Sequence, residues 1–245
     1  PKPGAIRSWD HNADKWDYPV IIDNMMNLEL LFWATRETQD STYYQIAVQH
    51  AETTMRNHFR EDHSSYHVIS YDTLSGEVAK RNTHQGHSHA SAWARGQAWG
   101  LYGFTMTYRE TGDQKYLDQA RNIADFLLNL ENLPEDMVPY WDFNAPNIPD
   151  EPRDASAAAI LCSGLYELST HLGAEGTVYQ EAADKILISL SSEKYRAPVG
   201  ENHNFILKHS VGHLPNNSEI DVPIIYADYY FIEACMRKLK IESDQ

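Results

Sequence analysis

The chain has 245 residues, of which 42% are hydrophobic and 22% charged, a composition typical of a globular domain with a sizeable core. Its formal net charge of -15 argues against nucleic acids and anionic membrane surfaces as partners, so basic groups that meet an acidic ligand must be local to its site. No run of about 18 apolar residues is present, which excludes an apolar membrane-spanning segment.

Apolar side chains recur at helical spacing in seven segments. These predict helices over 24–38, 42–60, 91–111, 114–131, 155–171, 177–191 and 223–238. Two stretches between them, His67–Tyr71 and Val138–Phe143, alternate in the manner of β-strands. Cys162 and Cys235 both lie inside apolar helical patterns, which predicts buried thiols and no disulfide.

Three junctions between predicted helices resemble one another: Thr35–Tyr43, Tyr108–Tyr116 and, more weakly, Thr170–Tyr179. Each ends one helix at a polar or glycine turn and begins the next at a Tyr-x-x-x-Ala face. The repeating unit is a helical hairpin followed by a long return loop, which favours an all-α array of hairpins over a four-helix bundle. Because the first predicted helix has no preceding partner, we expect residues 1–245 to form a single domain that lacks the first hairpins of the array.

Asp23 separates two apolar stretches, Pro19–Ile22 and Asn24–Leu28. Aspartate is a preferred residue at helix N-caps, so one interpretation is a cap for the helix that follows. The other is a carboxylic acid in an apolar pocket, where desolvation raises its pKa and lets it hold a proton near neutral pH. Capping would lower the pKa instead, so the two interpretations predict opposite shifts.

The segment 91–104 places one arginine and two tryptophans among small residues of a predicted helix. Arginine binds carboxylates through two parallel hydrogen bonds and tryptophan stacks on flat apolar faces, so this composition is typical of a site for an anionic, ring-shaped ligand. Arg95 and Trp99 are four residues apart and share a helix face, with Gln85 in the loop upstream. The alternative is an arginine whose stem packs on tryptophan within the helix surface.

The loop after the first predicted strand is rich in histidine. His84, His87 and His89 supply imidazoles at a spacing that metal sites use, which leaves a metal site as one interpretation. No partnering cysteine or carboxylate pattern follows, and neighbouring loop histidines often bind nothing. His67, in the extended stretch before this loop, is by itself more typical of an ordinary packed or exposed histidine.

Together these motifs resemble one family, the unsaturated glucuronyl hydrolases of glycoside hydrolase family 88. The similarity keeps the family's order and spacing along nearly the whole chain. The segments that carry it are Ile21–Leu28, Thr83–Gly86, Trp93–Gly100, Arg153–Ala158 and Ile225–Phe231. The resemblance implies an (α/α)6 barrel of six helical hairpins, consistent with the hairpin array, and it implies neither a metal ion nor a cofactor.

The resemblance also implies a chemistry. Such enzymes act on sugars that a polysaccharide lyase leaves with a C4=C5 double bond in the non-reducing uronic acid: an acid protonates C4, water adds at C5, and the hemiketal collapses. Transferred to this chain, the acid is Asp23. The implied substrate contacts are His67, Gln85, Arg95 near the uronate, Trp99 as a stacking platform and, in a less certain register, Trp9. The family's second aspartate has no position in this chain.

The implied partner is therefore an unsaturated uronate oligosaccharide of the glycosaminoglycan type, bound by a monomer or weak homo-oligomer. The histidines after Gln85 depart from the family pattern and leave the neighbouring sugar and its sulfate groups open. An unsaturated rhamnogalacturonyl hydrolase and a non-catalytic carbohydrate-binding fragment remain alternatives. The compartment stays open between bacterial cytoplasm and periplasm.

Overall fold

The computed structural model describes residues 2–244 and is mostly helical. Its α-helices are α1 (Asn24–Thr38), α2 (Ser41–Asn57), α3 (Ala94–Thr111), α4 (Gln114–Leu128), α5 (Ala155–His171), α6 (Thr177–Ser191) and α7 (Ile225–Ser243). Its strands are β1 (Tyr18–Ile21), β2 (Val68–Tyr71), β3 (Val78–Asn82), β4 (Ser210–His213) and β5 (Ser218–Val222). No helix within residues 2–244 is long and apolar enough to cross a membrane.

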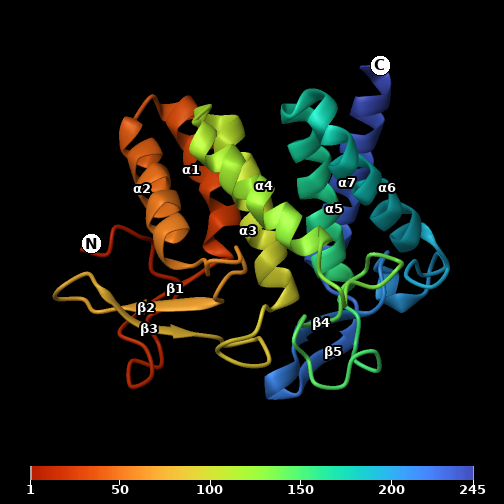
Figure 1. Ribbon diagram of the computed structural model, residues 1–245, viewed down its shortest axis with the longest axis horizontal. Coiled ribbons are helices and arrows are strands. Elements are labelled where there is room, and N and C mark those ends of the chain that lie inside the picture. The colour runs from red at the N-terminus through yellow and green to blue at the C-terminus, as the bar shows by residue number, and fades with distance from the viewer. Residues whose placement is uncertain (1, 245) are drawn as a thin grey trace.

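The helices pair as hairpins, which confirms the predicted all-α array. α1 packs on α2, α3 on α4 and α5 on α6, while α1, α3, α5 and α7 follow one another as an inner row (Figure 1). α3 and α5 are buried along most of their length, so this row contains the main core. The paired helices agree with the α/α-barrel architecture expected from the sequence.

The repeated junctions have a common physical basis. α1 ends at Gln39 and α3 at Gly112, both in the left-handed region at φ 57° and 69°, which closes the last helical turn. The next residue in each case, Asp40 or Asp113, accepts a hydrogen bond from a backbone N–H in the first turn of the following helix. The third junction differs, because a short 3₁₀ helix over Gly173–Gly176 leads into α6.

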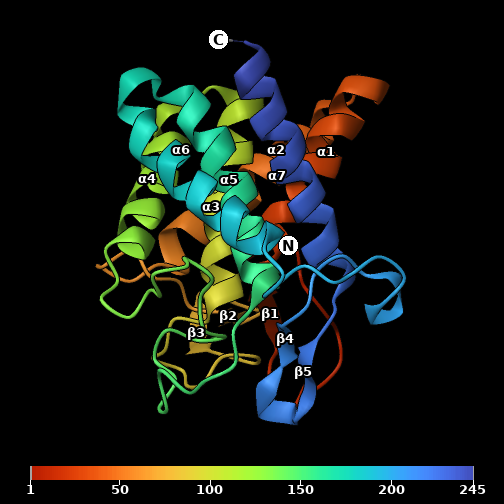
Figure 2. The ribbon, with the colours of Figure 1, turned by 90° about the vertical axis from the view of Figure 1, so that its right-hand side faces the viewer.

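Two small antiparallel sheets, β1-β2-β3 and β4-β5, lie at the same end of the helices, where α1, α3, α5 and α7 begin (Figures 1 and 2). The strand predicted at His67–Tyr71 is confirmed as β2. The strand predicted at Val138–Phe143 is wrong, because this segment makes only isolated bridges, one from Tyr140 and one from Asp142. The chain there crosses between α4 and α5 without a strand to pair with.

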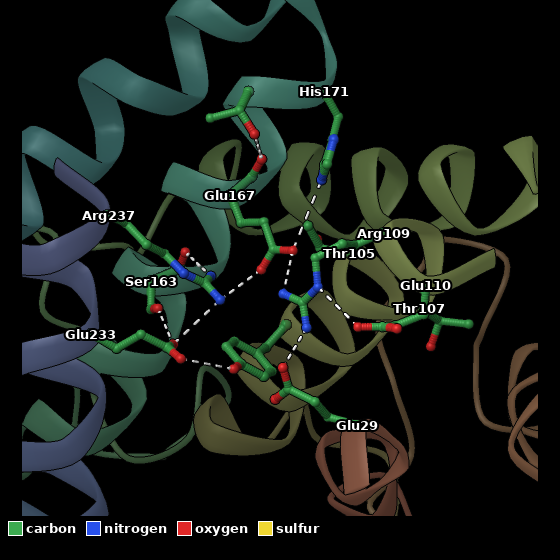
Figure 3. Close-up of polar contacts among 12 residues, drawn as sticks. Glu29, Thr105, Thr107, Arg109, Glu110, Ser163, Glu167, His171, Glu233 and Arg237 are labelled. Carbon is green, nitrogen blue, oxygen red and sulfur yellow. Dashed lines mark hydrogen bonds and ion pairs between the residues drawn. The ribbon is translucent and has the colours of Figure 1, made fainter. Parts of the chain in front are cut away.

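The opposite end of the inner row is joined by a half-buried charge network (Figure 3). Arg109 on α3 pairs with Glu29 on α1 and, at 2.7 Å, with Glu167 on α5. Arg237 on α7 pairs with the second oxygen of Glu167, also at 2.7 Å, and Glu233 accepts a hydrogen bond from Tyr102 on α3. Four helices are thus tied together far from their first turns.

The outer faces of α1 and α7, the first and last helices of the inner row, carry exposed apolar side chains. Leu30 and Trp33 on α1, and Tyr229, Ile232 and Met236 on α7, are each about half exposed or more. Both thiols are free as predicted; that of Cys162 is buried and that of Cys235 half-buried.

Candidate active site

Asp23 is held between β1 and α1 at the end of the inner row where the sheets lie. β1 pairs with β2 so that Ile21 lies opposite Val68, and the Ile22 N–H then donates to the His67 carbonyl over 3.1 Å. This register brings the side chain of His67 next to that of Asp23, the residue that follows Ile22. The distance from His67 Nε2 to Asp23 Oδ2 is 3.8 Å.

The Asp23 carboxyl does not act as a helix cap. It occupies the N-cap position of α1 with helical backbone angles and makes no capping hydrogen bond. Its side chain is 22% exposed, but Oδ2 is buried and has no hydrogen-bond partner within residues 2–244. Desolvation raises the pKa of Asp23 to about 6, against the opposing effects of the Arg95 charge and the Trp99 indole N–H. The shift agrees with the acid interpretation and not with the capping one.

His67 is a neutral donor that faces this acid. Its ring is almost fully buried, and Nδ1 accepts the backbone N–H groups of His84 and Gln85, each at 3.1 Å. Because Nδ1 is occupied as an acceptor, the ring proton resides on Nε2, the atom nearest Asp23. Burial and the neighbouring His84 ring hold the pKa of His67 well below its usual value, so the ring stays uncharged.

Arg95 and Trp99 lie one turn apart on α3, beneath Asp23, and both are almost fully buried. The Arg95 guanidinium donates to Asp154 over 3.1 Å and to backbone carbonyls of β4, and it lies over the Trp93 ring. The Trp99 ring packs edge to face on Tyr230. In this arrangement the hydrogen-bond partners of Arg95 belong to the chain itself, and neither face of the Trp99 ring is exposed. Both side chains therefore form the wall of the site behind Asp23.

Gln85 and Trp9 lie on the other side of His67. Gln85 Nε2 donates to the Gly212 carbonyl over 2.9 Å, which joins the histidine loop to β4. Trp9 is half-buried, packs edge to face on Trp16 with centroids 5.2 Å apart, and lies 5.8 Å from the His84 ring. All six predicted residues thus belong to one region, in which Trp9 is the most peripheral.

The loop histidines do not gather as a metal site. Among residues 2–244 no group of three or more histidine, cysteine, aspartate or glutamate side chains is placed to hold a metal ion. His84 instead faces the aromatic rings of Trp16 and His213. His89 accepts the Thr83 N–H through Nδ1.

Sequence reasoning missed three groups around the acid. Asp154 caps α5 and pairs with Arg95, Tyr226 on α7 lies under the Arg95 charge, and His213 on β4 covers His84. The signal for Asp154 is present, since an aspartate precedes the apolar run 155–161 as an N-cap would. Its pairing with Arg95 joins residues 59 positions apart and leaves no local pattern.

The chain is similar to proteins with one activity. An unsaturated glucuronyl hydrolase of Formosa agariphila is 56% identical over 96% of this chain and 58% of its own length. A crystal structure of an unsaturated glucuronyl hydrolase specific for heparin matches with a TM-score of 0.96 and 55% identity, over 99% of this chain and 64% of that one.

A third relative is a Streptococcus agalactiae unsaturated glucuronyl hydrolase, a variant crystallised with dGlcA-GalNAc6S. It matches with a TM-score of 0.78 and 35% identity, over 89% of this chain and 58% of its own. No family model matches the chain. The chain spans about three fifths of the length of these relatives. Over that shared stretch it belongs to the unsaturated glucuronyl hydrolases.

Proposed function

We propose that this chain carries the proton donor of an enzyme that removes 4,5-unsaturated glucuronic acid from the non-reducing end of glycosaminoglycan-type oligosaccharides. One observation supports this most strongly. The Asp23 carboxyl is desolvated, its Oδ2 has no hydrogen-bond partner within residues 2–244, and its pKa is raised to about 6. A group with these properties holds its proton to a pH about two units higher than an ordinary aspartic acid does.

The hydration chemistry requires such an acid because a proton must be transferred to carbon. Asp23 gives its proton to C4 of the vinyl ether, and positive charge develops at C5 and the ring oxygen. Water bonds to C5 and returns a proton to the Asp23 carboxylate. The hemiketal then opens by breaking its C5–O5 bond, which leaves a ketone at C5 and a hemiacetal at C1. The hemiacetal collapses to an aldehyde and releases the hydroxyl of the next sugar, so that protons and bonds balance and Asp23 is regenerated.

The neighbours of Asp23 fit this sequence. His67 Nε2–H lies 3.8 Å from Oδ2, a separation that leaves the donor free to turn to a substrate hydroxyl or to the attacking water. The buried Arg95 charge favours the carboxylate that forms after proton transfer, and it limits how far desolvation raises the pKa. The site therefore balances the two protonation states that the acid must pass through.

The substrate class is proposed from the relatives. One is named as specific for heparin and another was crystallised with dGlcA-GalNAc6S, both glycosaminoglycan-type. An unsaturated rhamnogalacturonyl hydrolase would share the chemistry, but the Met25-Met26-Asn27 and Arg95-Gly96-Gln97 motifs argue against it. A non-catalytic carbohydrate-binding fragment is the other candidate, and it would bind unsaturated oligosaccharides without turning them over.

A panel of unsaturated disaccharides tests the proposal. The panel holds one disaccharide each from heparin, chondroitin and pectin, turnover is followed as loss of the double-bond ultraviolet absorbance, and binding is measured in parallel by calorimetry. We expect turnover of at least one glycosaminoglycan disaccharide and none of the pectin-derived one. Turnover of the pectin disaccharide alone would favour an unsaturated rhamnogalacturonyl hydrolase. Binding without turnover would favour the binding fragment, and neither binding nor turnover would refute the proposal.

A further inference from the structure

Asp154 lies behind the wall of the site and is completely buried. Its Oδ1 accepts the N–H of Ser156 at 3.0 Å and caps α5. Its Oδ2 accepts from Arg95 Nη1 at 3.1 Å, and the Arg95 side chain is 3% exposed. The Asp154 carboxylate therefore caps the start of α5 and also binds the Arg95 guanidinium, which extends from the first turn of the neighbouring helix α3.

The same arginine fixes the hairpin of β4 and β5. Arg95 Nη1 donates to the Val211 carbonyl, and Nη2 donates to the Gly212 carbonyl over 3.0 Å. The Gly212 carbonyl also accepts from Gln85 Nε2. A continuous chain of hydrogen bonds thus runs from Asp154 through Arg95 and Gly212 to Gln85, in the loop whose backbone N–H groups bind His67.

Several elements pack around Asp23, and each could place a charge near it. Few charged groups are present, since most neighbours are apolar or aromatic. The titratable groups are His67 before β2, Arg95 on α3, Tyr226 on α7 and, behind them, Asp154 at the start of α5 and Glu219 on β5. His67 is neutral, and burial raises the pKa of Tyr226 to about 12, so this group is also uncharged near neutral pH. Arg95 is the charged side chain that lowers the pKa of Asp23, and Asp154 is its ion-pair partner.

We propose that Asp154 is a positioning residue for Asp23: it holds the Arg95 guanidinium in one orientation and offsets its charge, so that no uncompensated cation faces the acid. This role rests on the proposed function of Asp23. Without the Asp154 charge, Arg95 would act on Asp23 as an unpaired buried cation. Such a cation stabilises the ionised carboxylate of Asp23, so the acid would lose its proton at a lower pH.

The test is the titration of Asp23 itself, which needs no turnover. Carbon-13 NMR of the labelled chain follows the Asp23 carboxyl resonance, assigned by its loss in Asp23→Asn. We expect the midpoint near 6 in the parent chain to fall by about 1 pH unit, a tenfold change in acid dissociation, in Asp154→Asn. Arg95→Gln moves it upward, because it removes the cation.

Asp228→Asn is the matched control. Asp228 is also buried in the first turn of an inner helix and accepts two backbone N–H groups, from Ile206 and Leu207, but forms no ion pair within residues 2–244. We expect it to cost stability and to leave the Asp23 midpoint in place. An unchanged or higher midpoint in Asp154→Asn, or an equal fall in Asp228→Asn, would overturn the proposal.

Asp154→Ser provides a second route if the asparagine variant does not fold. Serine retains a capping oxygen for α5 and removes the carboxylate that pairs with Arg95. The same downward shift is expected. If neither variant folds, Arg95→Gln decides, since an unchanged midpoint there overturns the charge argument. Failure of the disaccharide panel with a shifted midpoint would refute the proposed function and leave only the electrostatic coupling of Asp154 to Asp23.

Discussion

Gly103 marks the closest approach of α1 and α3, and replacing it with alanine tests how tightly these helices are packed. A Cβ atom at position 103 would lie 2.3 Å from the Met25 Cβ, and 3.1 to 3.2 Å from the Met25 backbone. Ordinary contacts begin near 3.4 Å, so α1 would have to retreat by about 1 Å. A change of rotamer cannot relieve a clash with a backbone.

The magnitude follows from two opposing effects. Alanine in a helix interior is favoured over glycine by about 1 kcal/mol. Overpacking against a backbone costs about 3 kcal/mol, the upper end of its usual range. We therefore expect Gly103→Ala to lower the free energy of unfolding by about 2 kcal/mol. Gly100 is the control, because its added Cβ would meet Ile123 and Phe59 at an ordinary 3.5 Å, and Gly100→Ala should be neutral or stabilising.

Urea unfolding followed by far-ultraviolet circular dichroism measures both variants under one set of conditions. The expected order of midpoints is Gly100→Ala at or above the parent chain, with Gly103→Ala clearly below it. Equal midpoints for the two variants would refute the reasoning, since helix propensity alone affects both sites alike.

Two further predictions concern charge. The pKa of Asp23 is raised from 3.8 to about 6, so protonation of Asp23 stabilises the folded state below pH 4, and this contribution is lost as the pH rises through 6. The free energy of unfolding of Asp23→Asn, relative to that of the parent, should therefore rise by about 3 kcal/mol between pH 4 and pH 8 in urea unfolding. A difference that does not change with pH would contradict the shift. Arg109→Ala removes one of the two arginine partners of Glu167 and leaves Arg237 in place, so it should cost about 1 to 3 kcal/mol. Arg121→Ala breaks an exposed pair and should cost less, about 1 kcal/mol at most, in the same urea assay.

Local periodicity predicts most of the helices. The segments 155–171 and 177–191 coincide with α5 and α6, because their apolar faces and end signals are contained in the segments themselves. The helix predicted from 91 begins at Ala94 instead. The residues before it pair with the crossing loop, where the Trp141 carbonyl accepts the Ala94 N–H. That pairing is a tertiary contact, and no local pattern encodes it.

The strands show the same limit. β3 reads Val-Ala-Lys-Arg-Asn, which does not alternate between apolar and polar residues. β5 reads Ser-Glu-Ile-Asp-Val and alternates over only four residues, too short a stretch to predict a strand. Each forms because a neighbouring strand supplies the hydrogen bonds, β2 for the first and β4 for the second. Sequence reasoning predicted β2 alone, whose residues are all buried.

The candidate site divides in the same way. The apolar neighbours of Asp23 in the chain predict a desolvated carboxyl, and the structure agrees. The expectation for Arg95 came from its residue type, which fits a ligand carboxylate and a protein carboxylate equally well. In the structure Arg95 contacts Asp154 and Val211, which lie 59 and 116 positions further along the chain. Sequence spacing carries no information on which carboxylate it meets.

The most direct test of the central claim compares the parent protein with Asp23→Asn on the unsaturated disaccharide that the panel selects. Asparagine keeps the shape of the side chain and has no acidic proton to transfer. We expect Asp23→Asn to bind the disaccharide with similar affinity and to lose about a hundredfold or more of the rate at which the double-bond absorbance disappears. Near-normal turnover in a folded Asp23→Asn protein would contradict the assignment of the proton donor.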